Sequence, residues 1–159
     1  MKMTHFAVAS LRILLVAAFA LLLLLQTMSF PGQFAHMAQE SPERAFLQWP
    51  LTAFAVVELL CAQVVIVSTW KLLTLVRRDR IFSGAATAWV NAIVWAVLVA
   101  WTLLFGLFLA VGLTADDPGA PLLLSVFVVG GAVIGLLMLV LRELLRQATT
   151  LRSDMEAVI

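Results

Sequence analysis

The sequence predicts an all-α, polytopic membrane protein with four transmembrane helices, on the evidence of its composition, its apolar runs and its basic residues. Of 159 residues, 64% are hydrophobic and only 12% are charged, whereas soluble domains carry about 25% charged residues. A spanning helix needs about 20 mostly apolar residues, and the runs 8–30, 51–76, 85–111 and 122–141 all meet that length. Little remains outside these runs, so residues 1–159 are expected to form a single transmembrane domain.

The basic residues predict how these helices are oriented. Nine of the ten Lys and Arg residues fall on one side of a four-span arrangement: Lys2, Arg12, Lys71, Arg77, Arg78, Arg80, Arg142, Arg146 and Arg152. Positively charged residues collect on the cytoplasmic side of membrane proteins. Both termini and the loop around Arg77–Arg80 are therefore predicted to be cytoplasmic, and the expected location is the bacterial cytoplasmic (inner) membrane.

The first run, 8–30, has an uninterrupted apolar core short enough for a signal peptide. No convincing small-x-small cleavage site follows it, so a retained transmembrane helix is predicted. The next residues, 31–50, are expected to form an extracytoplasmic loop with a short helix starting at Ser41-Pro42-Glu43. Serine can cap a helix, proline suits its first position, and glutamate suits its first turn.

The second run, 51–76, contains Glu58 among apolar neighbours. An ionisable residue at this depth is costly and is by default a functional hypothesis. Counting about 1.5 Å of rise per residue places Thr102 of the third run and Gln26 of the first at comparable depth. Three interpretations stay open: a neutral glutamic acid hydrogen-bonded between helices, a proton- or cation-handling group, and a polar contact between protomers. The lone Cys61 forms no internal disulfide.

The last two runs carry features of helix ends and helix packing. Ser83 precedes the third run, 85–111, and is a good N-cap residue. The fourth run, 122–141, contains Gly131-xxx-Gly135, a small-xxx-small pattern that permits close helix approach. This pattern serves either packing within the bundle or dimerisation.

Residues 142–159, after the fourth run, are predicted to continue that helix into the cytoplasm. Apolar residues there follow a 3-4-3-4-3 spacing, typical of an a/d seam: Leu141, Leu144, Ala148, Leu151, Met155 and Val158. The resulting apolar stripe either packs on the bundle or the lipid surface, or it binds a partner.

The second loop and the tail leave the membrane on the same side in this arrangement. They are therefore expected to form one cytoplasmic docking surface from these residues: Arg77, Arg78, Arg80, Ile81, Phe82, Leu144, Leu151 and Met155. The acidic residues of the tail, Glu143, Asp154 and Glu156, are expected to pair with the loop arginines.

The sequence offers no set of residues for catalysis. His5 and His36 fall on opposite sides of the predicted membrane, and no Ser/His/Asp or Cys/His set assembles without crossing it. We therefore expect no enzyme activity, no catalytic residue, no metal site and no cofactor. The arginine loop is too short for direct nucleic-acid binding.

Two segments resemble a known family. RDRIFSGAATAWVNAI resembles the inner-loop signature, and LLRQATTLRSDMEAVI the C-terminal end, of the YoaS-like family, a domain of unknown function found in small four-helix bacterial membrane proteins. The tails of that family often finish Glu-Asn-Asp-Leu-Thr-Ile, whereas this chain finishes Ser-Asp-Met-Glu-Ala-Val-Ile. The resemblance implies no established activity, and it implies association with a small helix-turn-helix regulator.

Three functions are consistent with these features. The first is a non-enzymatic membrane component of a regulatory pair, which docks a small cytoplasmic helix-turn-helix protein. The second is a small transport-like oligomer in which Glu58 handles protons or cations. The third is an accessory structural subunit of a membrane complex. The expected partners are the lipid bilayer, a soluble regulator and further copies of the chain.

Overall fold

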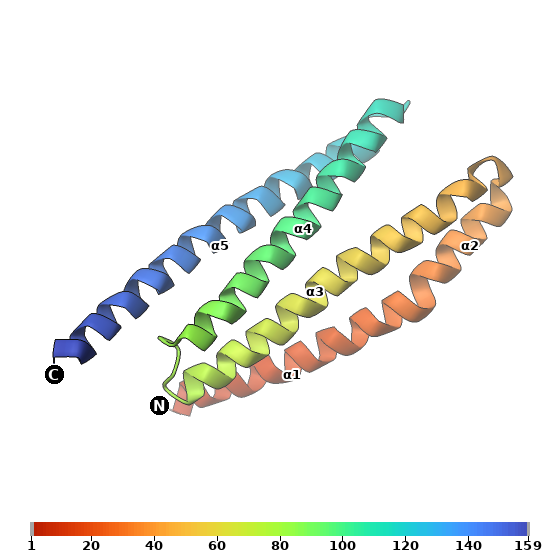
Figure 1. The fold of residues 1–159 in the computed structure, drawn as a ribbon. Coiled ribbons are helices and arrows are strands. Elements are labelled where there is room, and N and C mark those ends of the chain that lie inside the picture. Colours follow the sequence, from red (N-terminus) through yellow and green to blue (C-terminus); the bar gives the residue numbers. More distant parts are fainter. Residues whose placement is uncertain (1, 159) are drawn as a thin grey trace. The chain divides into compact units, whose positions relative to one another are not determined.

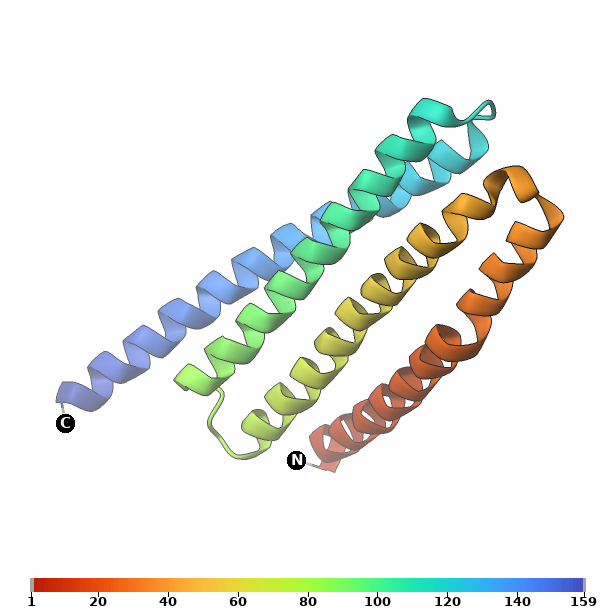
Figure 2. The ribbon, with the colours of Figure 1, turned by 45° about the vertical axis from the view of Figure 1, so that its right-hand side comes forward.

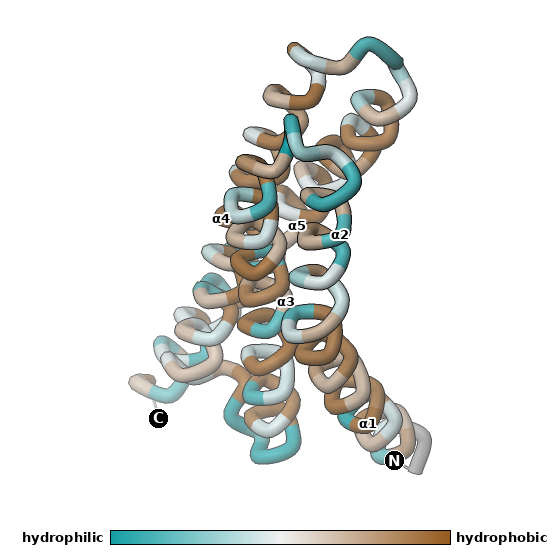
Figure 3. The backbone as a smooth tube through the Cα atoms, turned by 90° about the vertical axis from the view of Figure 1, so that its right-hand side faces the viewer, coloured by the Kyte–Doolittle hydropathy of each residue, from teal (hydrophilic) through white to brown (hydrophobic). Residues whose placement is uncertain are grey.

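The computed structural model describes residues 2–158, and every regular element among them is helical. Four helical stretches are long and apolar enough to cross a membrane: Thr4–Glu40, Pro42–Arg77, Gly84–Thr114 and Gly119–Val158. Figure 3 shows long hydrophobic stretches within the helices and hydrophilic residues at the connecting turns. The prediction of an all-α protein with four potential membrane spans is confirmed.

The first stretch is longer than expected. It consists of α1 (Lys2–Leu24), the π-helix η1 (Leu25–Ser29) and α2 (Phe30–Glu40). The expectation that the helix ends at residue 30 and is followed by a long loop is wrong, because the chain stays helical through Pro31.

The wide turn η1 lies where Pro31 would disturb a regular helix. Proline has no N–H, and its ring clashes with the carbonyl four residues earlier, which here belongs to Thr27 of η1. The N–H of Phe30 bonds to the carbonyl of Leu25, five residues back. A π turn of this kind shifts the neighbouring carbonyls and lets a helix continue with a change of direction. Figure 2 shows that break between α1 and α2.

A short 3₁₀ helix, η2 (Pro42–Leu47), follows at the place where a short helix was expected. Ser41 occupies its N-cap position, but the serine side chain forms no capping hydrogen bond. The next helix, α3 (Gln48–Arg77), extends a few residues beyond the predicted run at its start. The chain divides into two compact units between Ile66 and Val67, inside α3.

In the second unit, α4 (Gly84–Thr114) packs along α5 (Gly119–Val158), as Figure 1 shows. The most deeply buried side chains of α4 are small or β-branched, as at Ala86 and Val94. The Trp101 indole N–H donates a hydrogen bond of 2.8 Å to the Val128 carbonyl of α5. This bond links the two helices near the middle of their contact.

Helix α5 confirms the prediction that the fourth helix continues beyond its apolar run. It has 40 residues and is therefore about 60 Å long, whereas the hydrocarbon core of a bilayer is about 30 Å thick. No break separates the apolar run from the tail. If α5 crosses a membrane, its last turns stand outside the hydrocarbon region.

Candidate functional site

Three places in the structure contain the residues that the sequence singled out. The first is the polar group around Gln26 in the first unit, which joins the π-helix to α3. Gln63 is buried, and its side-chain amide donates to Gln26 Oε1 at 2.9 Å. Gln26 in turn donates from Nε2 to the Val56 carbonyl at 3.3 Å. The amide of Gln26 therefore bonds α3 through Gln63 and a carbonyl, not through Glu58.

Glu58 lies apart from this hydrogen-bonded pair. Its Oε1 atom is shielded from solvent and has no hydrogen-bond partner among residues 2–158. Thr102, the other expected partner, is exposed and donates from Oγ1 to the Leu98 carbonyl of its own helix at 2.8 Å. Within the first unit, Gln26 bonds to Gln63 and to the Val56 carbonyl and not to Glu58.

Two further buried polar atoms lie in the second unit. Ser68 is only 1% exposed, and neither its Oγ nor the Oδ1 of Asn91 has a hydrogen-bond partner in the part of the chain that the structure describes. A buried polar group without a partner costs about 1–3 kcal/mol. Sequence reasoning did not identify Ser68, because a lone serine in an apolar run carries no signal of its burial.

The second place is the surface formed by the loop after α3 and the tail of α5. The end of α3 forms a Schellman motif, in which the Arg80 N–H bonds to Leu75 O at 2.9 Å and the Asp79 N–H bonds to Val76 O at 3.1 Å. Asp79 adopts the left-handed conformation that this motif requires, with φ of 56°. The loop arginines thus extend from a turn whose backbone is hydrogen-bonded.

Ser83 occupies the N-cap position of α4, as its sequence position indicated. Its hydroxyl does not cap the helix but donates to the Arg80 carbonyl at 2.7 Å. This bond ties the start of α4 back to the turn. The loop between α3 and α4 is consequently short and held at both of its ends.

The tail of α5 contacts this loop. The guanidinium of Arg152 lies over the ring of Phe82, 5.5 Å from its centroid. Figure 1 shows α5 running on past the start of α4. We define the loop–tail surface by the residues expected to form it: Arg77, Arg78, Arg80, Ile81, Phe82, Leu144, Leu151 and Met155.

The charges of the loop–tail surface are arranged differently from expectation. Glu143 and Glu156 pair within α5, with Arg146 at 4.0 Å and Arg152 at 3.4 Å. The expected pairing of Glu143 and Glu156 with loop arginines is wrong, because arginines one turn away on the same helix are closer partners. The loop arginines are exposed and form no ion pair within residues 2–158.

The apolar stripe of the tail is left uncovered. Leu151 is 64% exposed and Met155 is 70% exposed, and Leu144 and Val158 are exposed as well. No residue of the described chain covers the stripe along its length. The stripe is therefore open to a partner or to lipid.

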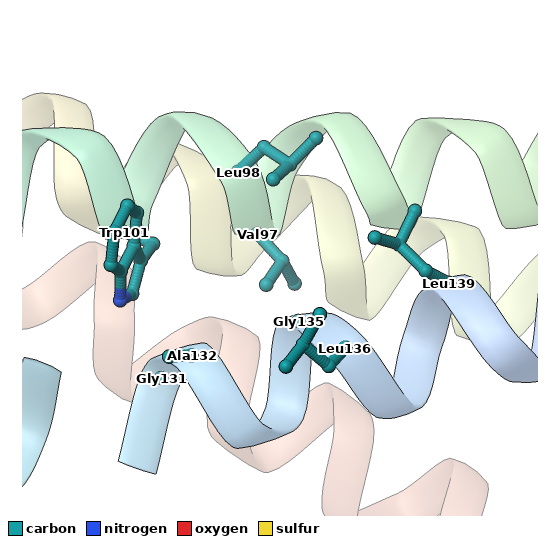
Figure 4. Close-up of a pocket in the computed structure, with 8 residues that line it drawn as sticks. All are labelled: Val97, Leu98, Trp101, Gly131, Ala132, Gly135, Leu136 and Leu139. Atoms are coloured by element: carbon teal, nitrogen blue, oxygen red, sulfur yellow. The ribbon is translucent and has the colours of Figure 1, made fainter. Parts of the chain in front are cut away.

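The third place is the interface of α4 and α5, where the two glycines of the small-xxx-small pattern lie. A Cβ atom on Gly131 would lie 2.9 Å from Cδ1 of Trp101, closer than real contacts allow, while one on Gly135 would lie 3.8 Å from Val97. Figure 4 shows Trp101 and Val97 projecting from α4 toward these glycines. The glycines thus face α4 of the same chain.

A groove lies beside these glycines. It encloses about 210 Å³ between Val97, Leu98 and Trp101 of α4 and the stretch of α5 from Gly131 to Leu139. Its lining is almost entirely apolar, because the Trp101 N–H is already bonded to Val128 O. We call it the α4–α5 groove.

In the first and second units alike, the described residues hold no cluster of three His, Cys, Asp or Glu side chains suited to a metal ion.

Comparison with known proteins gives one relationship. No curated protein and no solved structure matches the chain. Residues 32–159 match the family described as "Protein of unknown function (DUF2975)". The match begins within α2 and includes α3, α4, α5 and both parts of the loop–tail surface. The chain therefore belongs to the DUF2975 family of proteins of unknown function.

Proposed function

We propose that this protein is the membrane component of a regulatory pair and that its loop–tail surface docks a soluble cytoplasmic protein. The observation that carries the proposal is the exposed apolar stripe of the α5 tail, which lies beside a loop that presents three arginines. The contact of Arg152 with Phe82 holds these two segments together. Exposed apolar stripes on helices are a common means of binding a partner helix or groove.

The geometry of α5 favours a protein partner over the lipid surface. A helix lies flat on a membrane only if it turns away from the spanning segment, and α5 continues without a break from Gly119 to Val158. The tail therefore leaves along the direction of the span. Leu151 and Met155, which lie 10 and 14 residues beyond Leu141, then stand about 15–20 Å past the end of the apolar run, out of reach of the acyl chains.

The chemistry of the surface indicates what kind of partner fits. Apolar side chains on the tail require an apolar complement, and the unpaired arginines of the loop favour carboxylates on the partner. The asymmetry of basic residues supports a cytoplasmic location for this surface. The resemblance to the YoaS-like family supports a small helix-turn-helix regulator as the partner.

Site-specific photo-crosslinking in native cells tests the proposal. A crosslinker at residue 148, within the stripe, is expected to capture a small helix-turn-helix protein from cells that express the chain at its natural level. The double variant Leu151→Lys and Met155→Lys should abolish that product, because it places two charges in the stripe. The double variant Ser153→Lys and Ala157→Lys, with the same spacing on the opposite face, should leave it unchanged. Equal capture in both variants would exclude the stripe as the docking site.

The predicted orientation needs its own measurement. Reporter fusions after residue 159 should be active only for a cytoplasmic reporter, and fusions within residues 33–44 only for an exported one. A translocated C-terminus would remove the cytoplasmic docking proposal.

A second candidate function rests on Glu58. Its Oε1 is buried without a hydrogen-bond partner among the described residues, and an ionisable group in that situation is a candidate for proton or cation handling. Glu58→Gln removes the titratable proton and keeps the shape of the side chain. Loss of a cellular phenotype in this variant, at unchanged protein level, would support the second function over the first.

A further inference from the structure

We propose that the α4–α5 groove binds an acyl chain of an anionic phospholipid and that Arg142 holds the phosphate of its headgroup. The inference concerns a site separate from the loop–tail surface and does not depend on the proposed function. It rests on the shape of the groove, on the position of Arg142 along α5, and on the level of a neighbouring cation–aromatic pair.

The groove has the chemistry of a hydrocarbon site. Its walls are the side chains of Val97, Leu98 and Trp101 and the backbone of α5 at Gly131 and Gly135. No polar group is presented to an occupant, since the Trp101 N–H bonds to Val128 O. An occupant therefore gains from burying apolar surface and has nothing to hydrogen-bond. The missing side chain at Gly131 leaves room for the Trp101 ring, and a Cβ atom on Gly135 would already contact Val97 at 3.8 Å, so the occupant lies beside these contacts.

The groove opens outward, toward the apolar face of the two helices. Leu98, Leu136 and Leu139 line the groove and remain exposed at its edge. In a helix that crosses a membrane, such a face contacts lipid chains. An acyl chain reaches the groove from the surrounding bilayer without crossing the protein.

Arg142 stands at one end of the groove and on the same side of α5. It follows Gly135 by seven residues, which returns a helix to within about 20° of the same direction and advances it by about 10 Å. Arg142 is partly buried and forms no ion pair within residues 2–158. Arg146, one turn further on, already lies 4.0 Å from Glu143. Arg142, unlike Arg146, is thus left for a ligand at this end of the groove.

The level of Arg142 matches the expected boundary between hydrocarbon and headgroups. The helices α4 and α5 are antiparallel, and Trp101 faces Gly131 while Val97 faces Gly135. Continued along both helices, this register places Arg142 opposite the turn that contains Trp89. The ammonium of Lys71 lies 5.9 Å from the ring centroid of Trp89. Tryptophans with basic neighbours are typical of the membrane interface.

The length of helix between the groove and Arg142 also matches the thickness of one membrane leaflet. From Gly131 to Arg142 is 11 residues, or about 16 Å of helix, and half of the hydrocarbon thickness is about 15 Å. A lipid with its phosphate at Arg142 therefore reaches the groove with its acyl chain. A guanidinium group can donate two parallel hydrogen bonds to two oxygens of one phosphate. A lipid with a net negative charge is also attracted at longer range by Arg142 and Lys71.

Native mass spectrometry of the full chain in detergent tests this site. Purified protein is titrated with phosphatidylglycerol or with phosphatidylcholine of the same acyl chains. We expect preferential binding of phosphatidylglycerol. Gly135→Leu fills the groove and should weaken binding of both lipids by about tenfold, the effect of losing a few methylene contacts. Arg142→Gln should retain binding but lose the preference for phosphatidylglycerol.

Two matched controls belong to this experiment. Gly130→Leu places the same side chain on the open face of α5, where a Cβ atom meets no neighbour, and should bind lipid as the natural chain does. Arg152→Gln removes a charge ten residues beyond Arg142 and should keep the lipid preference. Equal binding by Gly135→Leu and Gly130→Leu would overturn the acyl-chain site. An unchanged preference in Arg142→Gln would overturn the headgroup assignment.

A second measurement tests the site without the Gly135→Leu variant, in case that variant does not fold. A chain that retains Trp101 and carries phenylalanine at its four other tryptophan positions is placed in vesicles with brominated acyl chains. Trp101 fluorescence should be quenched more strongly by brominated phosphatidylglycerol than by brominated phosphatidylcholine. Equal quenching would overturn the proposal. Loss of a stable dimer in Gly135→Leu without any change in lipid binding would also overturn it and would assign the groove to a second copy of the chain.

Discussion

The guanidinium of Arg152 lies 5.5 Å from the centre of the Phe82 ring, so the tail of α5 contacts the loop that connects α3 to α4. The two residues are 70 positions apart in the sequence. Their contact lies between a helix that carries an exposed apolar stripe and a turn that carries three exposed arginines. Both parts of the loop–tail surface are thereby held in a defined relationship.

Phe82→Leu is expected to loosen the tail. The substitution keeps apolar bulk but removes the aromatic face, and an exposed cation–π contact contributes about 0.5–1 kcal/mol. Hydrogen exchange of the backbone in residues 144–158 should become faster. Because Arg152 also pairs with Glu156, the contact is isolated by a double-mutant cycle with Arg152→Gln. Fully additive effects of the two substitutions would show that the residues do not interact.

Gly131→Ala is expected to destabilise the packing of α4 on α5. The added methyl would lie 2.9 Å from Cδ1 of Trp101, and overpacking of this kind costs about 1–3 kcal/mol. The neighbouring Gly130→Ala meets no atom and should stabilise the helix by about 0.5–1 kcal/mol. Unfolding in mixed micelles with increasing dodecyl sulfate measures both. Effects of the same sign would contradict the close approach of Trp101.

Gln63→Leu is expected to weaken the attachment of the first helical stretch to α3. It removes the 2.9 Å bond to Gln26 Oε1, and such bonds in membrane proteins contribute about 0.6 kcal/mol on average. Gln26→Leu should cost more, because it also removes the bond to the Val56 carbonyl. The same unfolding measurement applies. A cycle with no coupling between the two positions would argue against the bond.

Glu58→Leu is expected to have the opposite effect to Gln63→Leu on the same helix. A buried oxygen without a partner costs about 1–3 kcal/mol, and leucine removes it, so the free energy of unfolding should rise. Glu58→Gln keeps a polar oxygen at this place and should change stability little. Destabilisation by Glu58→Leu would indicate that a bonded partner, such as a second copy or a water molecule, satisfies the carboxyl group.

Asp79→Gly is expected to stabilise the turn after α3 by about 0.5–1 kcal/mol, because glycine adopts a positive φ without steric cost. Asp79→Asn makes the same change in charge, and asparagine also tolerates the left-handed conformation. The Asp79→Asn variant should therefore raise the free energy of unfolding by less than Asp79→Gly does. The comparison separates the effect of the backbone from the effect of the charge. Equal gains in the two variants would assign the effect to charge alone.

The four membrane-length helices were predictable because the length of an apolar run can be read directly from the sequence. No tertiary contact changes that length. The end of the first helix was not predictable in the same way. Pro31 in a sequence usually marks the end of a helix, and only the π turn at Leu25–Ser29 lets the chain continue. The sequence shows the proline, but it does not show whether the helix ends there or continues through a π turn.

The expected partners of Glu58 show the limit of counting residues along a helix. Rise per residue gives depth, but a hydrogen bond also requires the correct rotation of both helices. Gln26 was placed at a suitable depth and does bond to α3, yet it bonds to Gln63 and Val56. The N-cap position of Ser83 was correct, while its hydroxyl bonds to Arg80 instead of capping α4. Position along the chain was predictable, and the direction of the side chains was not.

The contact between loop and tail was predictable in outline, since both segments follow spans that end on the same side. The pairing of their charges was not, because Glu143 and Glu156 each pair with an arginine one turn away on their own helix. The loop–tail surface remains a prediction as a docking site.

Because the helical backbone of α5 is unbroken, the direction in which the tail stripe faces is fixed relative to the direction in which the α4–α5 groove faces. Residues that line the α4–α5 groove and residues of the tail stripe share one rigid rod, so a one-residue insertion after Leu141 turns the stripe by about 100° relative to the groove. A seven-residue insertion restores the direction to within about 20° while moving the stripe about 10 Å outward. Under the docking proposal, a seven-residue insertion at this junction should therefore be tolerated better than a one-residue insertion.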